Sequence, residues 1–460
     1  MSTAPPLANT SPSAHKSYFK EALKLSLPLV ISQFLIMANG FICNLMLSRV
    51  SESAFAAGLF INTIQMILVT VVFGLLSSLS PLIGIVTGQG KPERVGQLFI
   101  AGCIISLILS FSSIAILIYI EPIMLLLGQP ENLAHLCAEY FRIYLWSVPA
   151  AGLITVFIQL FLGTFKQVVV FLYSIGNLLL SSVLSYILIF GKFGFPAMGL
   201  EGLAWAISIT SCVAVLSLGC FIFRSSDYKD KKLTNLKWQF LKQDSGRIIR
   251  LGFPISLHVG NEMFSFLFII IMVGWISIEA LNMQQVVTRY LMMLAIPIFG
   301  LSQAVTVAIS KQFGEEKFGE VINIGRAYIR MGVIYSSVVL LLFATIPDVF
   351  IRVFIDNTPQ NTAIYKTLSI ILILVAIGQV FDAIKNIVTG SLRGLHDTKF
   401  PMLLSFITVW PIGVPLAYLM GFTFEWGLIG ITIAHSLAIA FSCIFLYWRW
   451  IQKSRNMAKR

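Results

Sequence analysis

Residues 224–250 read RSSDYKDKKLTNLKWQFLKQDSGRIIR, from Arg224 to Arg250, and they form the longest polar stretch of the chain. The stretch lies almost at the midpoint of the 460 residues, and long apolar runs flank it on both sides. A basic segment between two sets of apolar runs is typical of a linker on the cytoplasmic side of a membrane. The parts that we predict are an N-terminal cytoplasmic tail at 1–21, a first lobe at 22–223, the linker at 224–248, a second lobe at 249–449 and a C-terminal tail at 450–460.

The composition places the flanking runs in a lipid bilayer. Hydrophobic residues make up 57% of the chain and charged residues only 11%, whereas soluble domains carry roughly 25% charged residues. A bilayer core about 30 Å thick needs about 20 apolar residues per helix, and a helix satisfies its own backbone groups within one span. The sequence therefore predicts an all-α integral membrane protein with twelve transmembrane helices at 22–47, 55–86, 96–120, 136–162, 168–190, 199–223, 249–275, 280–310, 325–346, 363–390, 400–420 and 427–449.

Basic residues alternate between the loops that join these helices. One set of loops is rich in Lys and Arg, and the other set holds only about five basic residues, at Arg49, Arg142, Lys192, Arg352 and Lys366. By the positive-inside rule the rich set is cytoplasmic, so we expect both termini in the cytoplasm and an even number of spans. The net charge of +12 then reflects topology and not nucleic acid binding. We predict a multi-pass monomer in the cell (inner) membrane, with the lipid bilayer as its surroundings.

The two halves resemble each other at a nearly constant offset in residue number. The matching pairs are Pro28 and Pro254, Ser51 and Ser277, Gly88 and Gly314, Gly163 and Gly390, and Gly199 and Gly427. Six helices per repeat give both copies the same orientation. We therefore predict two six-helix bundles that are related by a pseudo-two-fold axis along the membrane normal, with substrate between them.

Several short motifs, taken in order, resemble the multidrug and toxic compound extrusion (MATE) family. The first is Gly40-Phe41-Ile42, with Ser53-Ala54-Phe55 at the entry to the second predicted helix. Loop motifs follow at Ser80-Pro81-Leu82 and Leu301-Ser302-Gln303. The sharpest is Phe381-Asp382-Ala383, followed by Gly390-Ser391-Leu392-Arg393-Gly394-Leu395-His396-Asp397-Thr398. The resemblance extends from about Ala22 to Trp450, and it is to the bacterial NorM-type branch.

This resemblance implies the MATE fold and a secondary active antiporter. Such a protein exports small organic molecules across the cytoplasmic membrane by alternating access, and an inward flow of protons or sodium ions drives it. The family's bacterial sodium-coupled branch has a glutamate in helix 7 and an aspartate in helix 10, and these correspond to Glu262 and Asp382, the implied cation-coupling residues. Many members also have an aspartate in helix 1, where this chain has Cys43. The resemblance implies no cofactor and a small-molecule substrate.

The position of Glu262 and Asp382 inside apolar runs also points to function. An ionised carboxylate at that depth costs at least ~2.5–3.5 kcal/mol, so it should face a cavity, a partner or an ion. Two such groups could hold a hard cation such as sodium through oxygen ligands, or they could exchange protons. Structural pairing with a cation is the other interpretation.

Two basic residues lie in the same predicted helices or next to them. Lys385 follows Asp382 by three residues and shares its helical face, and Arg289 lies in the predicted helix 280–310. Either they neutralise the carboxylates, Lys385 on Asp382 and Arg289 on Glu262 or a carbonyl, or they contact an anionic or zwitterionic substrate. A lasting pair between Lys385 and Asp382 would weaken sodium binding and favour protons. Further candidates for substrate contact or interhelical hydrogen bonding are Gln33, Asn39, Asn44 and Gln284.

Three other classes of protein remain as alternatives. A lipid or lipid-linked oligosaccharide flippase would suit the two cations, although the motif around Asp382 argues against it. An enzyme would need clustered polar residues, whereas the five histidines are scattered. A passive channel has less need of duplicated halves. The six cysteines form no C-x-x-C pair, so we predict no metal site or disulfide from them. In the loop after 363–390, we expect Arg393 and Asp397 to form a salt bridge or a helix cap.

Overall fold

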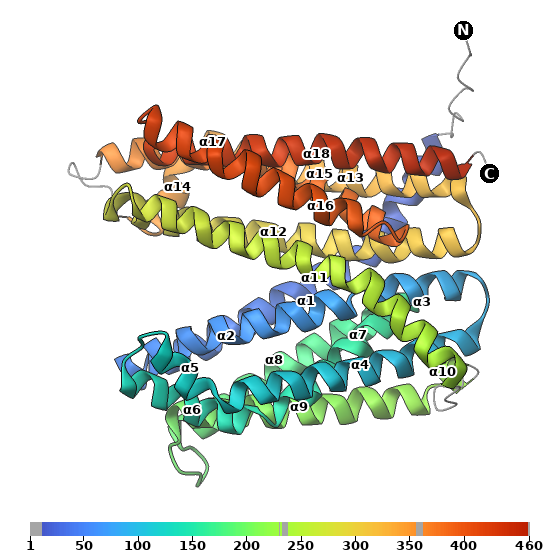
Figure 1. Cartoon of the computed structure of the whole chain (residues 1–460), viewed down its shortest axis with the longest axis horizontal. Helices are drawn as coiled ribbons and strands as arrows, with labels where there is room; N and C mark the ends of the chain where they lie inside the picture. The colour runs from blue at the N-terminus through green and yellow to red at the C-terminus, as the bar shows by residue number, and fades with distance from the viewer. Residues whose placement is uncertain (1–11, 230, 232–237, 356–361, 459–460) are drawn as a thin grey trace. The chain divides into compact units, whose positions relative to one another are not determined.

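The computed structural model describes residues 12–229, 231, 238–355 and 362–458, and these ranges are helical with short connections (Figure 1). Positions 1–11 of the predicted tail, 230 and 232–237 of the linker, and 459–460 lie outside the described residues. The first half contains α1 (Pro12–Leu47), α2 (Glu52–Leu76), α3 (Leu79–Gly88), α4 (Pro92–Ile118), α5 (Ile120–Leu126), α6 (Glu131–Tyr144), α7 (Ser147–Gly163), α8 (Gln167–Phe190) and α9 (Gly199–Arg224). After α10 (Ser226–Lys229), the second half contains α11 (Trp238–Gly274), α12 (Ile278–Gly314), α13 (Phe318–Thr345), α14 (Pro347–Arg352), α15 (Thr362–Gly394), α16 (Lys399–Ile407), η2 (Thr408–Gly413), α17 (Val414–Tyr418), η3 (Leu419–Thr423) and α18 (Gly427–Ala458).

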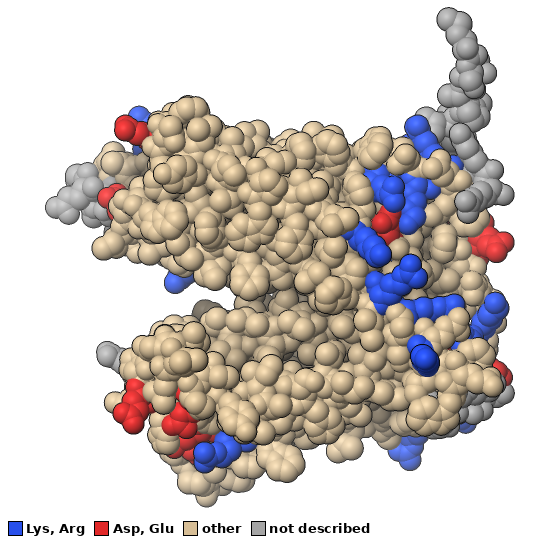
Figure 2. Space-filling view, in the orientation of Figure 1, with Lys and Arg blue, Asp and Glu red and all other residues tan. Residues whose placement is uncertain are grey.

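The number of membrane-spanning segments agrees with the sequence. Within the described residues, 11 helical segments are long and apolar enough to cross a bilayer, and α6 with α7 forms one broken span, which gives up to 12. This confirms the predicted all-α membrane fold. Figure 2 shows that charged side chains on the face in view gather toward the ends of the helices and leave uncharged surface between them. Such a band is what lipid tails require.

The span that the sequence predicts as one helix over 136–162 is broken. Its parts, α6 and α7, meet at an angle of 57°. Pro149 has no N–H to donate to the carbonyl of Leu145, and the hydroxyl of Ser147 donates to the carbonyl of Tyr144 at 2.7 Å. The helix therefore breaks where the carbonyl of Leu145 has no N–H of residue 149 to accept from, and where the hydroxyl of Ser147 donates to the carbonyl of Tyr144.

The predicted helix at 400–420 also differs, because it contains two π-helical segments. η2 includes Pro411, and Pro415 lies at the start of α17. Each proline removes one N–H from the ladder, and the wider turns of a π-helix redistribute the remaining bonds. At Pro28, Pro254 and Pro297, by contrast, the helices continue through the proline.

The first helix of each half is longer than predicted. α1 begins at Pro12 and α11 at Trp238, well before the predicted starts at 22 and 249. Apolarity marks only the part of a helix that faces lipid, and both helices continue into polar sequence that can face water.

The chain packs as two compact units, and the division between them falls within these two long helices. One unit comprises Ile31–Gly260, and the other comprises the chain up to Val30 together with the chain from Asn261 onward. We call them the N-terminal unit and the C-terminal unit. The predicted lobes at 22–223 and 249–449 thus exchange the beginnings of their first helices. α1 up to Val30 belongs with the second half, and α11 up to Gly260 belongs with the first.

Glycines permit both exchanges in the same way. A Cβ atom on Gly300 would lie 2.7 Å from Cγ2 of Val30 in the C-terminal unit, and one on Gly74 would lie 2.7 Å from Oγ of Ser256 in the N-terminal unit. Both distances are too short for a real Cβ, so each position requires glycine. Gly74 and Gly300 are equivalent positions of the repeat, as are Val30 and Ser256. The repeat in the sequence is therefore a repeat of packing contacts.

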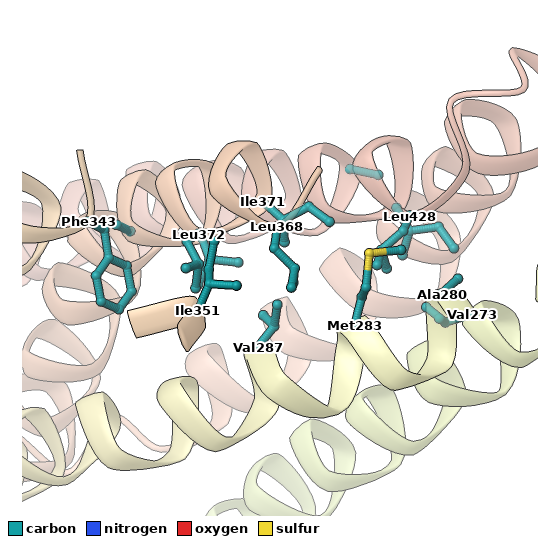
Figure 3. Close-up of a cluster of buried hydrophobic side chains, with 14 of the residues drawn as sticks. Val273, Ala280, Met283, Val287, Phe343, Ile351, Leu368, Ile371, Leu372 and Leu428 are labelled. Atoms are coloured by element: carbon teal, nitrogen blue, oxygen red, sulfur yellow. The ribbon is translucent and has the colours of Figure 1, made fainter. Parts of the chain in front are cut away.

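α15 is the central helix of the C-terminal unit, because it packs against α12, α13 and α18. Figure 3 shows Val287 of α12 directed toward Leu368 of α15, and Met283 of α12 directed toward Leu428 of α18. Leu368, Ile371 and Leu372 are fully buried. Close packing of this kind holds helices together in lipid, where the hydrophobic effect between helices is absent. It fixes the rotation of α15 and thereby the direction of the polar residues farther along the same helix.

Candidate functional site

Glu262, Asp382 and Lys385 come together in the C-terminal unit, and we call them the charge triad. The ammonium nitrogen of Lys385 lies 2.9 Å from Oε1 of Glu262 on α11 and 2.9 Å from Oδ1 of Asp382 on α15. The lysine side chain is 13% exposed, the aspartate 20% and the glutamate 36%. One partly buried cation thus joins carboxylates from two helices.

The helical spacing explains half of this arrangement. Residues three apart on an α-helix lie on the same face, so Asp382 and Lys385 of α15 meet as the sequence predicts. The bond between Lys385 and Glu262 depends on how α11 packs against α15, which no local pattern records. Distances of 2.9 Å are typical of charge-assisted hydrogen bonds, which are about twice as strong as neutral ones.

Asn386 holds the other oxygen of Asp382. Its Nδ2 donates to Oδ2 of Asp382 at 2.9 Å and to the aspartate's backbone carbonyl at 3.0 Å. The two carboxylate oxygens of Asp382 are therefore both bonded, one to the lysine and one to the amide. Asn386 was not among the predicted site residues, although its spacing of four residues from Asp382 was a usable signal.

Further titratable groups lie in electrostatic range of the charge triad. Arg393, at the end of α15, interacts with Glu262. His435 of α18 interacts with all three members, and Cys443 of α18 interacts with Lys385 and Asp382. With two carboxylates and one ammonium, the triad carries a formal charge of −1, and the arginine adds positive charge nearby.

The residue before Glu262 belongs to a polar network that leads away from the triad. Asn261 is buried; its Nδ2 donates to Oγ of Ser405 at 3.0 Å, and its Oδ1 accepts from the indole Nε1 of Trp410 at 2.8 Å. Trp410 lies in η2, and its ring meets Phe268 of α11 edge to face. The network ties the irregular η2 segment to α11 next to Glu262. Asn261 and Ser405 were not predicted, because they come together only through packing.

The other predicted cation is not part of the triad. The guanidinium of Arg289 lies 5.3 Å from the ring centroid of Phe354, so its proposed pairing with Glu262 is replaced by a cation–π contact. Gln284, five residues earlier on α12, is buried. Asp397 accepts from Nε of Arg449 at 3.0 Å and lies 3.3 Å from Nζ of Lys453. Asp397 therefore forms salt bridges, but its partners lie on α18, and Arg393, which we expected beside it in the loop, lies in the last turn of α15.

The polar residues of α1 beyond Val30 belong to the N-terminal unit. Asn62 of α2 donates to Oδ1 of Asn44 at 3.1 Å, which confirms the interhelical hydrogen bond as one role for Asn44. Oδ1 of Asn39 is buried and has no hydrogen-bond donor among the described residues, and Gln33 is half-buried. Cys43 is buried with its sulfur 3.9 Å from Oγ of Ser185.

A metal site with three or more protein ligands of the usual kind is not formed by the described residues, since no three His, Cys, Asp or Glu side chains gather in that way. A sodium ion at Glu262 and Asp382 would thus depend on two carboxylates, with other oxygens to complete its shell. Both carboxylates are already bonded to Lys385.

Comparisons with known proteins give the chain its family. The sequence profile of the MatE family matches twice, over residues 28–187 and 254–419, and the two matches begin at Pro28 and Pro254, which are equivalent positions of the repeat. The "Probable multidrug resistance protein NorM" of Rhizobium meliloti (strain 1021) is 27% identical over 448 residues, covering 96% of this chain and 95% of the relative. The protein of the same name from Synechococcus sp. (strain ATCC 27144 / PCC 6301 / SAUG 1402/1) is 25% identical over 445 residues, covering 96% of this chain and 95% of the relative.

Solved structures show the same fold. The Vibrio cholerae MATE transporter VcmN in its bent form has a TM-score of 0.87 at 15% identity, covering 97% of this chain and 99% of that one. An outward-facing multidrug resistance MATE family transporter of the MOP superfamily also has a TM-score of 0.87, at 18% identity and with 96% and 97% covered. The repeated profile match covers well over half of the chain. The chain therefore belongs to the MatE family, and it is a multi-pass membrane transporter and not an enzyme.

Proposed function

We propose that this transporter exports small organic molecules across the cytoplasmic membrane in exchange for protons, with Glu262 and Asp382 as the proton-binding groups. The names of the relatives, which are probable multidrug resistance proteins, support drugs or other toxic compounds as substrates. The observation that carries the coupling is the position of Lys385, whose ammonium lies 2.9 Å from both carboxylates.

The lysine bears on the choice between protons and sodium ions. A sodium ion would have to displace a tethered cation from both carboxylates and then gather further oxygen ligands. A proton needs only one carboxylate oxygen. When it binds, the charge that holds Lys385 on that side is lost, so protonation alters the link between α11 and α15. This difference favours proton coupling.

The place of the charge triad along the chain supports its coupling to conformational change. Glu262 lies just after the point at which α11 passes from the N-terminal to the C-terminal unit. A change in the bond between Lys385 and Glu262 would therefore act on a helix that both units share. We infer alternating access between two six-helix lobes at 22–223 and 249–449, in a monomer whose termini are both cytoplasmic, as the alternation of basic loops predicts.

The charge of the triad also bears on the substrate. The positive charge of Lys385 is already matched by two carboxylates, so it does not offer an unpaired cation to an anionic substrate. We therefore favour cationic or neutral molecules over the anionic or zwitterionic substrates that the two buried cations suggested. The lipid flippase is not favoured either, because it required Lys385 and Arg289 as unengaged cavity cations.

Transport by the purified protein in liposomes tests the coupling. Export of a cationic dye should follow a proton gradient and should not follow a sodium gradient imposed alone. Glu262→Gln and Asp382→Asn should abolish it. Glu279→Gln, which alters an exposed acid at the start of α12, is the matched control and should transport normally.

Two outcomes would contradict the proposal. One is dye export that follows the sodium gradient alone, and the other is full activity of both carboxylate variants. In a drug-sensitive bacterial host, expression should raise resistance to cationic dyes or quinolones. Unchanged resistance together with altered surface lipids or glycans would favour the flippase instead.

A further inference from the structure

The geometry of the charge triad is that of a bound cation with two carboxylate ligands. Oε1 of Glu262 and Oδ1 of Asp382 come from different helices, and each lies 2.9 Å from one positively charged atom, Nζ of Lys385. We propose that Lys385 is a resident cation, which occupies the position of an alkali metal ion and excludes sodium from it. Removal of its charge should create a sodium site. This inference rests on the proposed role of the two carboxylates in coupling.

The bonds already made around the triad explain the exclusion. Oε1 and Oδ1 are bonded to Lys385, and Oδ2 of Asp382 is bonded to Asn386. A sodium ion that entered beside the lysine would meet like charge and would share these oxygens. One that replaced the lysine would compete with a group that is tethered to α15 and therefore present at a high effective concentration.

The same geometry explains why a sodium site would form without the lysine. Two oxygens that lie 2.9 Å from one point are separated by at most twice that distance. Both helices are held in place independently of the triad, α15 by its apolar contacts with α12, α13 and α18, and α11 by the network of Asn261, Ser405 and Trp410. The carboxylates should therefore remain close together and attract a small hard cation through oxygen ligands.

A purely structural ion pair makes a different prediction. If Lys385 served only to neutralise the carboxylates, its removal would destabilise the protein equally in every monovalent salt. Sodium-specific stabilisation of a lysine-free variant is therefore the result that separates a resident cation from a structural one.

The experiment measures thermal unfolding of the purified full chain in detergent at pH 8. Each protein is compared in NaCl and in choline chloride at equal ionic strength, since choline is a much larger cation than sodium. Lys385→Met keeps an unbranched apolar side chain and removes the charge. Lys366→Met is the matched control, because Lys366 is an exposed lysine on the same helix.

We expect sodium to raise the melting temperature of Lys385→Met saturably, by roughly 1–3 °C for each tenfold excess over its Kd. The wild type, Lys366→Met and the charge-preserving Lys385→Arg should show no sodium-specific rise. The double variant Glu262→Gln with Lys385→Met should lose the rise, because one ligand is gone. If Lys385→Met does not fold, Lys385→Gln takes its place in the same comparison.

Two results would overturn the inference. Sodium could stabilise the wild type as strongly as Lys385→Met, or it could stabilise no lysine-free variant. Because this readout is binding and not transport, it stands apart from the liposome assay. If the wild type fails to export dye on a proton gradient, the proposed function is refuted. The inference that Lys385 excludes sodium is then still tested by the effect of sodium on the melting temperature of Lys385→Met.

Discussion

Removal of Lys385 alone should be far more harmful to stability than removal of the whole charge triad. The ammonium is bonded to Glu262 and Asp382 at 2.9 Å each. Without it, two carboxylates face each other across a short gap. At a separation of about 6 Å and an effective dielectric constant near 20, two unit charges repel by ~3 kcal/mol, and each also loses its attraction to the lysine.

Solvent reduces this cost, because Glu262 is 36% exposed and Asp382 20%. Breaking a buried pair from one side generally costs about 3–5 kcal/mol. We therefore expect Lys385→Met to lower the free energy of unfolding by about 2–4 kcal/mol in sodium-free buffer. Replacing a buried ionic group entirely by neutral side chains is often close to neutral. The triple variant Glu262→Gln, Asp382→Asn, Lys385→Met should therefore recover most of the loss.

The assay is thermal unfolding in detergent with choline chloride, for the wild type, Lys385→Met, the triple variant and the control Lys366→Met. The single variant should melt well below the wild type, and the other two should melt close to it. A triple variant as unstable as the single one would mean that the aliphatic stem of the lysine matters and not its charge. A single variant as stable as the wild type would refute the electrostatic reasoning altogether.

Two further predictions concern other parts of the chain. A Cβ on Gly252 of α11 would lie 2.1 Å from the backbone oxygen of Leu75, so Gly252→Ala should lower the melting temperature and the yield of folded protein. The control Gly260→Ala, whose Cβ would meet no atom within 4 Å, should change neither. Equal melting temperatures of the two variants would contradict the close approach of Gly252 to Leu75. In the connection between α12 and α13, a hydrogen bond from Lys317 lowers the pKa of Glu315. The ionised carboxylate therefore stabilises the fold at pH values above its unfolded pKa of about 4.3. This stabilisation is lost as the pH falls through the lower pKa of the folded state. Glu315→Gln should therefore reduce the loss of melting temperature between pH 5 and pH 3, and an unchanged acid limb would contradict the assignment.

The spans could be predicted from the sequence because lipid imposes a simple rule on apolar length. The exceptions have local causes that the rule ignores. The break before α7 and the π-helical η2 lie at or next to Pro149, Pro411 and Pro415, whose nitrogens cannot donate a helical hydrogen bond. The early start of α1 at Pro12 reflects a helix that continues beyond its apolar part.

The candidate site was predictable only where a single helix determines it. The spacing of Asp382 and Lys385 was enough to predict their ion pair, whereas the second bond of Lys385, to Glu262, required the packing of α11 on α15. The same limitation explains Arg289. Its charge suggested a partner in the triad, but the rotation of α12 directs it to Phe354. Sequence gives the types of polar residue within a span, and packing decides which of them meet.

The repeat separates what the fold needs from what the chemistry needs. Glycines at close helix contacts recur in both halves. A Cβ on Gly202 would lie 2.6 Å from the carbonyl oxygen of Leu188, and one on Gly430 would lie 2.3 Å from that of Met420. Gly202 and Gly430 are equivalent positions of the repeat, so the duplicated architecture retains its packing constraints.

The charge triad does not recur. At the offsets of the repeat, Glu262 corresponds to Ile36, and Asp382 and Lys385 correspond to Thr155 and Ile158. The hydroxyl of Thr155 donates to a carbonyl of its own helix, at 2.9 Å, and the two isoleucines carry no charge. Because the same backbone repeat exists without these charges in the first half, the fold does not require them in the second. Charged groups in a span are costly, and this cost, which the architecture does not demand, supports the role in transport that we propose for them.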